Sequence, residues 1–159
     1  MKNIHILPTD KPSRLFKFAN QLIFDKETGV DKKRNQHIYI TNSEDIKDGY
    51  VTDGENLFKV ISNNFKTLRC TDKDNNLIKL HELRVKKIIL TTDPILIQSG
   101  VQEIDDEFIK WLVQNPSCEE VEVFQEKHHI GEVVDESYPK GFFDYKIIIP
   151  KEEHKQTIQ

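Results

Sequence analysis

Hydrophobic and polar residues alternate in short runs along most of the chain, and this pattern predicts a protein built mainly of β-strands. Turn residues separate the runs, most clearly at Asp53-Gly54, a dipeptide typical of tight hairpins. Short strands at this spacing favour a curled antiparallel sheet or a small barrel. By residue number, the expected strands are 3–7, 37–41, 50–51, 57–61, 67–70, 77–80, 87–92, 119–124 and 141–149.

The segment 14–24 allows two interpretations. As a helix, its apolar face would contain Leu15, Phe18, Ala19, Leu22 and Ile23. As a hairpin, two apolar runs would flank Asn20-Gln21 and pair with each other. We favour the hairpin because the segment is rich in aromatic residues, which prefer strands.

The clearest helical pattern lies between residues 104 and 113. Asp105 suits the N-cap of this helix, and Asn115-Pro116 suits its end. The apolar residues that recur at helical spacing are Ile104, Phe108, Trp111 and Leu112. We expect this stripe, with Trp111 buried in it, to lie at the centre of the core.

A shorter helical turn is expected directly after strand 87–92. Asp93 suits the N-cap, Pro94 the first helical position and Gly100 the end. The predicted fold class is therefore α+β: a strand-rich single domain over residues 1–150, with one main helix packed on the sheet. The charged segment 151–159 is expected to be a frayed tail.

Composition narrows the classes of function. The chain has 159 residues, and 23 basic against 27 acidic side chains give a net charge of -4, which argues against the whole surface serving nucleic acid or anionic lipid. No apolar run approaches the roughly 20 residues of a membrane span, and no export signal is recognisable. Cys70 and Cys118 lack CxxC spacing, so we expect a cytoplasmic protein with free thiols.

The chain carries no familiar catalytic or cofactor-binding motif. Neither a GxGxxG fingerprint nor a Walker loop is present. His37 and Thr41 do not have the spacing of a two-histidine phosphoesterase, and His128-His129 with the nearby carboxylates lack a recognised metal-ligand spacing. We therefore expect no catalytic residue, no metal and no cofactor. A ligand pocket near Thr91 to Asp93, where a strand ends and a helix begins, stays open as an alternative.

Two charged groups are candidate contact surfaces, although most such groups only solvate a protein. One is acidic, and it would suit a basic, nucleic-acid-binding protein. It comprises Asp106, Glu107, Glu119, Glu120 and Glu122. The other is the basic run Lys32-Lys33-Arg34 in a predicted loop, which would suit direct contact with RNA.

Several phrases of the sequence resemble a group of short proteins, without established activity, that are encoded by phages and prophages of Bacteroidota. The phrases are KNIHILPTDKPSRL, HIYITN followed by an acidic turn and IKDG, KKIILTTD, IDDEF with WLVQNPSCE, and YKIIIPKEE. The resemblance implies a phage context and a cytoplasmic site of action in the host. It implies no catalytic residue.

From this context we expect a non-catalytic protein that binds and inhibits a host protein effector. The most specific version of this hypothesis is a counter-defence, anti-CRISPR-like inhibitor of a host RNA-guided CRISPR nuclease. Such a nuclease is a ribonucleoprotein with basic guide-binding surfaces. Two alternatives stay open. One is a small-molecule-sequestering protein or enzyme with a pocket near Thr91 to Asp93, and the other is a structural or replication accessory protein of the phage.

Overall fold

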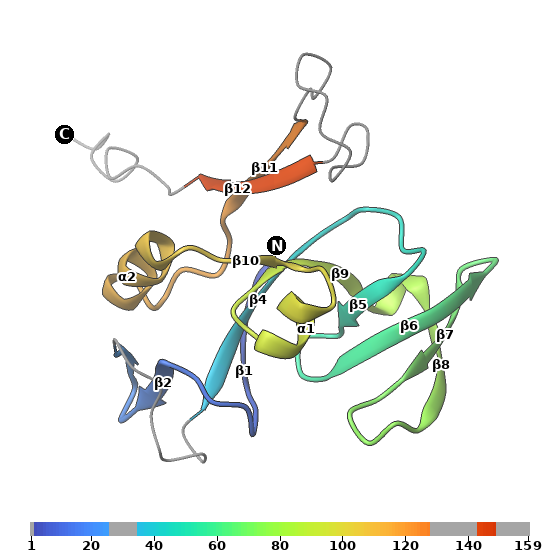
Figure 1. Ribbon diagram of the computed structural model, residues 1–159, viewed down its shortest axis with the longest axis horizontal. Helices are drawn as coiled ribbons and strands as arrows, with labels where there is room; N and C mark the ends of the chain where they lie inside the picture. The colour runs from blue at the N-terminus through green and yellow to red at the C-terminus, as the bar shows by residue number, and fades with distance from the viewer. Residues whose placement is uncertain (1, 26–34, 128–142, 149–159) are drawn as a thin grey trace. The chain divides into compact units, whose positions relative to one another are not determined.

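The computed structural model describes residues 2–25, 35–127 and 143–148. The chain divides into two compact units, residues 1–120 and 121–159, and each is described by itself (Figure 1). The expected single domain over 1–150 stays a prediction, and the predicted tail 151–159 lies outside the described residues.

The first unit is built on an eight-stranded sheet, and the fold class α+β with mostly sheet is confirmed. Its strands, in spatial order, are β1 (Ile4–Pro8), β4 (Gln36–Asn42), β9 (Lys86–Thr91), β5 (Gly49–Thr52), β6 (Leu57–Asn64), β7 (Thr67–Thr71) and β8 (Leu77–His81), with β10 (Gln102–Glu103) beside β9. Only the β9–β10 pair is parallel. The order begins at β1 and ends at β8, so the described strands form an open sheet and not a closed barrel.

The segment 14–24 forms the predicted hairpin and not a helix. Strands β2 (Leu15–Phe18) and β3 (Gln21–Phe24) pair antiparallel as a separate small sheet. Ala19 and Asn20 form the turn with φ of 50° and 68°. Both values lie in the left-handed region, whose twist matches that of a tight hairpin and which asparagine tolerates.

Both predicted helix starts are confirmed, because capping is a local interaction. Helix α1 (Pro94–Gln98) is capped by Asp93, whose carboxylate accepts from the Ile95 amide at 2.9 Å. Helix α2 (Asp106–Gln114) is capped by Asp105, which accepts from the Phe108 amide at 2.8 Å. A short 3-10 helix, η2 (Glu82–Arg84), joins β8 to β9. No helix in the described ranges is long and apolar enough to cross a membrane.

The apolar stripe of α2 differs from the prediction at Trp111. Phe108, Ile109 and Leu112 are buried, whereas Trp111 is only half-buried and stacks on Phe108 with ring centroids 5.8 Å apart. Each residue advances about 100° around a helix, so the side chains at 108, 109 and 112 share one face and Trp111 lies at its border. The expectation of a buried indole was therefore wrong.

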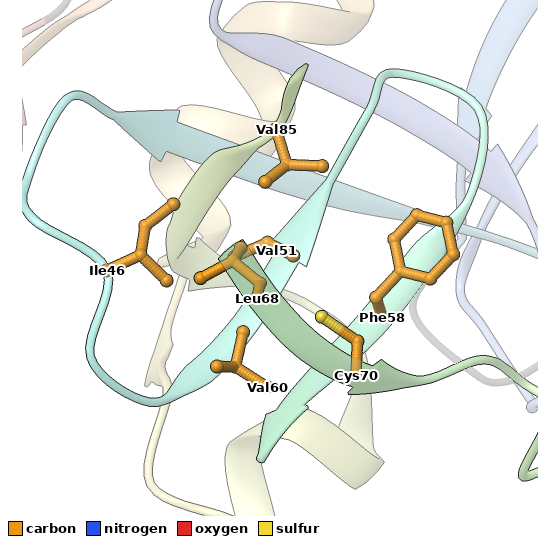
Figure 2. Packing of buried hydrophobic residues seen from close by; sticks show 7 residues of the cluster. All are labelled: Ile46, Val51, Phe58, Val60, Leu68, Cys70 and Val85. Atoms are coloured by element: carbon orange, nitrogen blue, oxygen red, sulfur yellow. The ribbon is translucent and has the colours of Figure 1, made fainter. Parts of the chain in front are cut away.

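A cluster of seven buried residues packs along β5, β6 and β7 (Figure 2). Alternation along each strand explains it: on β7, Leu68 and Cys70 are buried and Thr67 and Arg69 are exposed. The cluster comprises Ile46, Val51, Phe58, Val60, Leu68, Cys70 and Val85. It therefore anchors the β6–β7 hairpin to the rest of the first unit.

The second unit contains β11 (Glu122–Lys127) and β12 (Phe143–Ile148), which pair antiparallel. Val123 lies opposite Ile147, and both are half-buried. The two strands correspond to the expected strands 119–124 and 141–149, with β11 beginning three residues later than predicted.

The packing of α2 predicts that Leu112→Ala lowers the free energy of unfolding by about 2–5 kcal/mol, because it leaves a cavity in the core. Trp111→Ala should have a smaller effect, since the indole is already half in water. Urea denaturation of both variants measures the difference. A larger loss for Trp111→Ala would place the centre of the buried face at the indole.

Candidate functional site

The first unit contains an open pocket of about 410 Å³ beside the junction of β9 and α1. Thr92 lines it, so the pocket lies where the sequence suggested one near Thr91 to Asp93. The other lining residues are Pro12, Ser13, Arg14, Leu15, Phe24, His37, Pro94, Ile97, Glu103, Ile104 and Ile109. The wall is mostly apolar with a few polar groups, which is the usual composition of a small-molecule site.

His37 is the most deeply buried titratable group of the pocket, at 2% exposure. Its Nδ1 lies 3.0 Å from Thr92 Oγ1, which also accepts from the Ile38 amide at 3.0 Å. Because that oxygen already accepts a hydrogen bond, we assign its own proton to His37 Nδ1, which places the imidazole proton on Nε2. Nε2 has no partner with good hydrogen-bond geometry in the described part of the chain.

Burial lowers the pKa of His37, and nearby Lys11 acts in the same direction. The Asp93 carboxylate and the carbonyls of Pro12 and Lys11 oppose the shift without reversing it. The neutral imidazole is therefore the stable form at neutral pH, and it can offer one N–H donor.

Behind the pocket wall, Tyr39, Thr91 and Asp93 form a buried polar network. The Tyr39 hydroxyl donates to Asp93 Oδ2 at 2.5 Å, and Thr91 Oγ1 donates to the Ile38 carbonyl at 2.8 Å and accepts from the Asp93 amide at 3.0 Å. Burial and the adjacent Asp93 raise the pKa of Tyr39 above its usual value. The phenol therefore stays protonated, and the network holds the end of β9 against β4.

Two further polar residues of the pocket, Ser13 and Arg14, are also held by the fold. Ser13 Oγ donates to the Gln36 carbonyl at 2.5 Å and accepts from the Leu15 amide at 3.0 Å. The guanidinium of Arg14 lies 4.7 Å above the Phe24 ring and binds both carboxylate oxygens of Asp106, at 2.7 and 3.3 Å. These contacts fix the β2–β3 hairpin beside the start of α2.

The five predicted acidic contact residues have different surroundings. Asp106 is paired with Arg14, which lowers the pKa of that carboxyl, and Glu119 pairs with Lys2 at 2.8 Å. Glu107 and Glu120 are exposed in the first unit, and Glu122 is exposed on β11 of the second. That these five residues contact a basic partner stays a prediction.

The remaining candidates lie outside the described residues. They are Lys32, Lys33 and Arg34 of the basic run, and the pair His128 and His129. Across residues 2–25, 35–127 and 143–148, no three His, Cys, Asp or Glu side chains are grouped to hold a metal ion.

The two cysteines are both free thiols, as the sequence predicted. Cys70 is buried, and burial raises the pKa of its thiol, which keeps it protonated and unreactive. Cys118 is half-buried, and its thiol donates to the Glu120 carbonyl at 3.2 Å.

Sequence reasoning missed an exposed apolar pair, Phe65 and Leu83. Phe65 is 95% exposed in the β6–β7 turn, and Leu83 is 82% exposed in η2. The Glu82 amide donates to the Lys66 carbonyl at 2.8 Å, so the two segments touch. The available signal was a phenylalanine directly after Ser62-Asn63-Asn64, where turns usually carry glycine or asparagine.

The β6–β7 turn is also conformationally strained. Phe65 and Lys66 have φ of 52° and 66°, in the left-handed region that bulky side chains rarely adopt. Such a conformation costs about 1–2 kcal/mol per residue. An exposed aromatic side chain held in this way contributes nothing to the core, and strain of this kind points to function.

Comparison with known proteins gives no match: no family model, no curated protein and no solved structure is significantly similar to this chain.

The lowered pKa of His37 predicts a pH-dependent loss of stability. The unfolded chain binds the proton more readily than the folded one, so this contribution is present above the unfolded pKa of about 6.5 and is lost as pH falls toward the folded value. His37→Asn keeps a hydrogen-bonding group at the position of Nδ1 and removes the titration. The drop in unfolding free energy from pH 7.5 to 5.5 should be smaller in this variant than in the wild type.

His5, whose pKa is also lowered by burial and by Lys2, contributes in the same direction and is unchanged in both proteins. Equal drops in wild type and His37→Asn would contradict the assignment.

Proposed function

We propose that the protein is a phage-encoded, non-catalytic binding protein that acts in the host cytoplasm and inhibits a host effector. A host RNA-guided CRISPR nuclease is the sharpest candidate target. The observation that carries the proposal is the exposed apolar pair Phe65 and Leu83. Aromatic side chains are typical anchors of protein interfaces, where a few residues supply most of the binding energy.

The support beneath this pair favours a preformed binding surface. Leu68 and Cys70 on β7 are buried in the core cluster, and the register places Leu68 opposite Asn63 close to the turn. The paired and partly buried strands β6 and β7 thus hold the turn residue Phe65 in one backbone conformation before any partner arrives. A rigid anchor loses less conformational entropy on binding than a loose one.

The pocket chemistry favours binding over catalysis. The hydroxyls of Ser13, Thr91 and Thr92 all bond to main-chain groups, and Asp93 is both a helix cap and the acceptor of the Tyr39 proton. A nucleophile would need a neighbouring base to activate it, and these groups are instead bonded to the backbone or to each other. The resemblance to phage proteins without established activity also supports a binding function.

A second candidate function is the sequestration of a small molecule in the pocket. It is favoured by the mostly apolar wall around the neutral imidazole of His37, whose buried Nε2 has no hydrogen-bond partner among the described residues. A thermal-shift screen of nucleotides, metals and small apolar compounds tests it. A ligand that raises the melting temperature of the wild type and not of His37→Asn would favour this function. A structural or replication role in the phage is the third candidate.

The inhibitor function is tested in Bacteroidota cells in which a CRISPR nuclease eliminates a targeted plasmid. Expression of the wild-type protein should rescue the plasmid, and Phe65→Asn should reduce the rescue at least tenfold, because an interface anchor contributes about 2 kcal/mol or more. Asparagine tolerates positive φ, so the same variant should be as stable as the wild type or more stable. Rescue counts and thermal melts give the two measurements.

Ile95→Ser is the matched control, since Ile95 is 44% exposed on α1 and belongs to a different surface. It should rescue the plasmid as well as the wild type. Full activity of Phe65→Asn would exclude the turn as the anchor. No rescue by the wild type with any RNA-guided nuclease of these hosts would overturn the inhibitor proposal.

A further inference from the structure

The exposed side of β6, β7 and β8 carries an unusual arrangement of positive charge. Leu68 and Cys70 point into the core, so Arg69 between them points outward, and Lys59 and Lys79 are exposed on the neighbouring strands. Arg69 lies directly opposite Lys79 in the register, and Lys59 lies opposite Thr71 in the next row. We call Lys59, Lys66, Arg69 and Lys79 the basic face; Lys66 lies at its end, in the turn beside Phe65.

The charge of the basic face is not balanced on its own strands, and the acidic residues that directly follow them, Asp72, Asp74 and Glu82, lie in the β7–β8 turn and in η2. Strands β6, β7 and β8 contain no acidic residue, and none of the four cations forms an ion pair with another described residue. Two like charges directly opposite each other destabilise a sheet. Although the chain has a net charge of -4, this local excess of positive charge would attract an anionic partner.

The spacing of the charges suits a polyanion better than a single phosphate. Neighbouring strands lie about 4.8 Å apart, and residues two apart on one strand are separated by about 7 Å. The four cations are therefore spread over three strands and the adjoining turn, where they can follow a chain of phosphates. The exposed hydroxyl of Thr67 lies between Lys66 and Arg69 as an additional donor.

Phe65 indicates which polyanion fits. A positively charged surface with an exposed aromatic side chain is the usual platform for single-stranded nucleic acid, because unpaired bases stack on aromatic rings. The bases of a duplex are already stacked and cannot reach such a ring. The 95% exposure of Phe65 leaves its ring open for this contact.

We propose that the basic face, together with Phe65, binds single-stranded nucleic acid by contacts to its phosphates and by stacking of a base. RNA held by a ribonucleoprotein has this chemistry. The inference therefore rests on the proposed function and gives the class of partner that the surface around Phe65 would bind. It can be tested without any nuclease, and either proposal can fail while the other stands.

The test measures fluorescence anisotropy of a labelled 20-nucleotide uridine RNA with the full-length protein at several salt concentrations. Arg69→Gln/Lys79→Gln should weaken binding about tenfold at 50 mM salt. The slope of log K against log salt should become shallower by roughly 0.7 for each cation removed. The melting temperature of Arg69→Gln/Lys79→Gln should equal or exceed that of the wild type, because the two like charges no longer face each other. Phe65→Asn should weaken binding about tenfold with an unchanged slope.

Lys17→Gln/Lys47→Gln is the matched control, because both lysines are exposed outside this face and the change in net charge is identical. It should change binding less than twofold. The proposal is overturned if this control weakens binding as much as Arg69→Gln/Lys79→Gln, or if a duplex of the same length binds as tightly as the single strand. Equal binding of polyglutamate with no effect of Phe65→Asn would identify a general anion surface and also overturn it.

Discussion

The structure of the first unit depends on the end of β9, where main-chain pairing and buried side-chain hydrogen bonds coincide. Strand β9 pairs with β4 on one side and with β5 on the other, so it joins the two parts of the sheet. At its end, Thr91 and Thr92 bond to the main chain of Ile38, and Asp93 accepts from Tyr39 while capping α1. Removing any one of these partners would leave a buried polar group unsatisfied.

This constraint explains why several polar residues in and beside the pocket at β9 serve the fold. A side chain that holds two strands together cannot also change its proton or its position during a reaction without weakening the fold. His37 differs, because Nδ1 is held by Thr92 while Nε2 has no hydrogen-bond partner of good geometry within residues 2–25, 35–127 and 143–148. In the proposed small-molecule function, this imidazole would supply a hydrogen-bond donor to the ligand.

The opposite end of the sheet has the reverse character. There the hairpin β6–β7 is fixed by buried Leu68 and Cys70, while Phe65, Leu83 and the opposed Arg69 and Lys79 reduce stability or leave it unchanged. Strain, exposed apolar area and like charge are all unfavourable for an isolated protein. They occur together on β6, β7, β8 and η2, and this supports the proposed binding surface, because a partner would cover the apolar groups and neutralise the charge.

Local interactions are what the sequence determined by itself. The caps at Asp93 and Asp105, the Asp53-Gly54 turn and the alternation within strands act over a few residues, and so the helix starts, most strands and the strand-rich α+β class were predictable. Only tertiary structure decided the strand order, the half-exposure of Trp111 and the composition of both sites. His37 and Thr92 are 55 residues apart, and Arg69 meets Lys79 only through the register of β7 and β8. Such contacts depend on which strands pair, and pairing follows from the burial of the whole sheet, which no short stretch of sequence encodes.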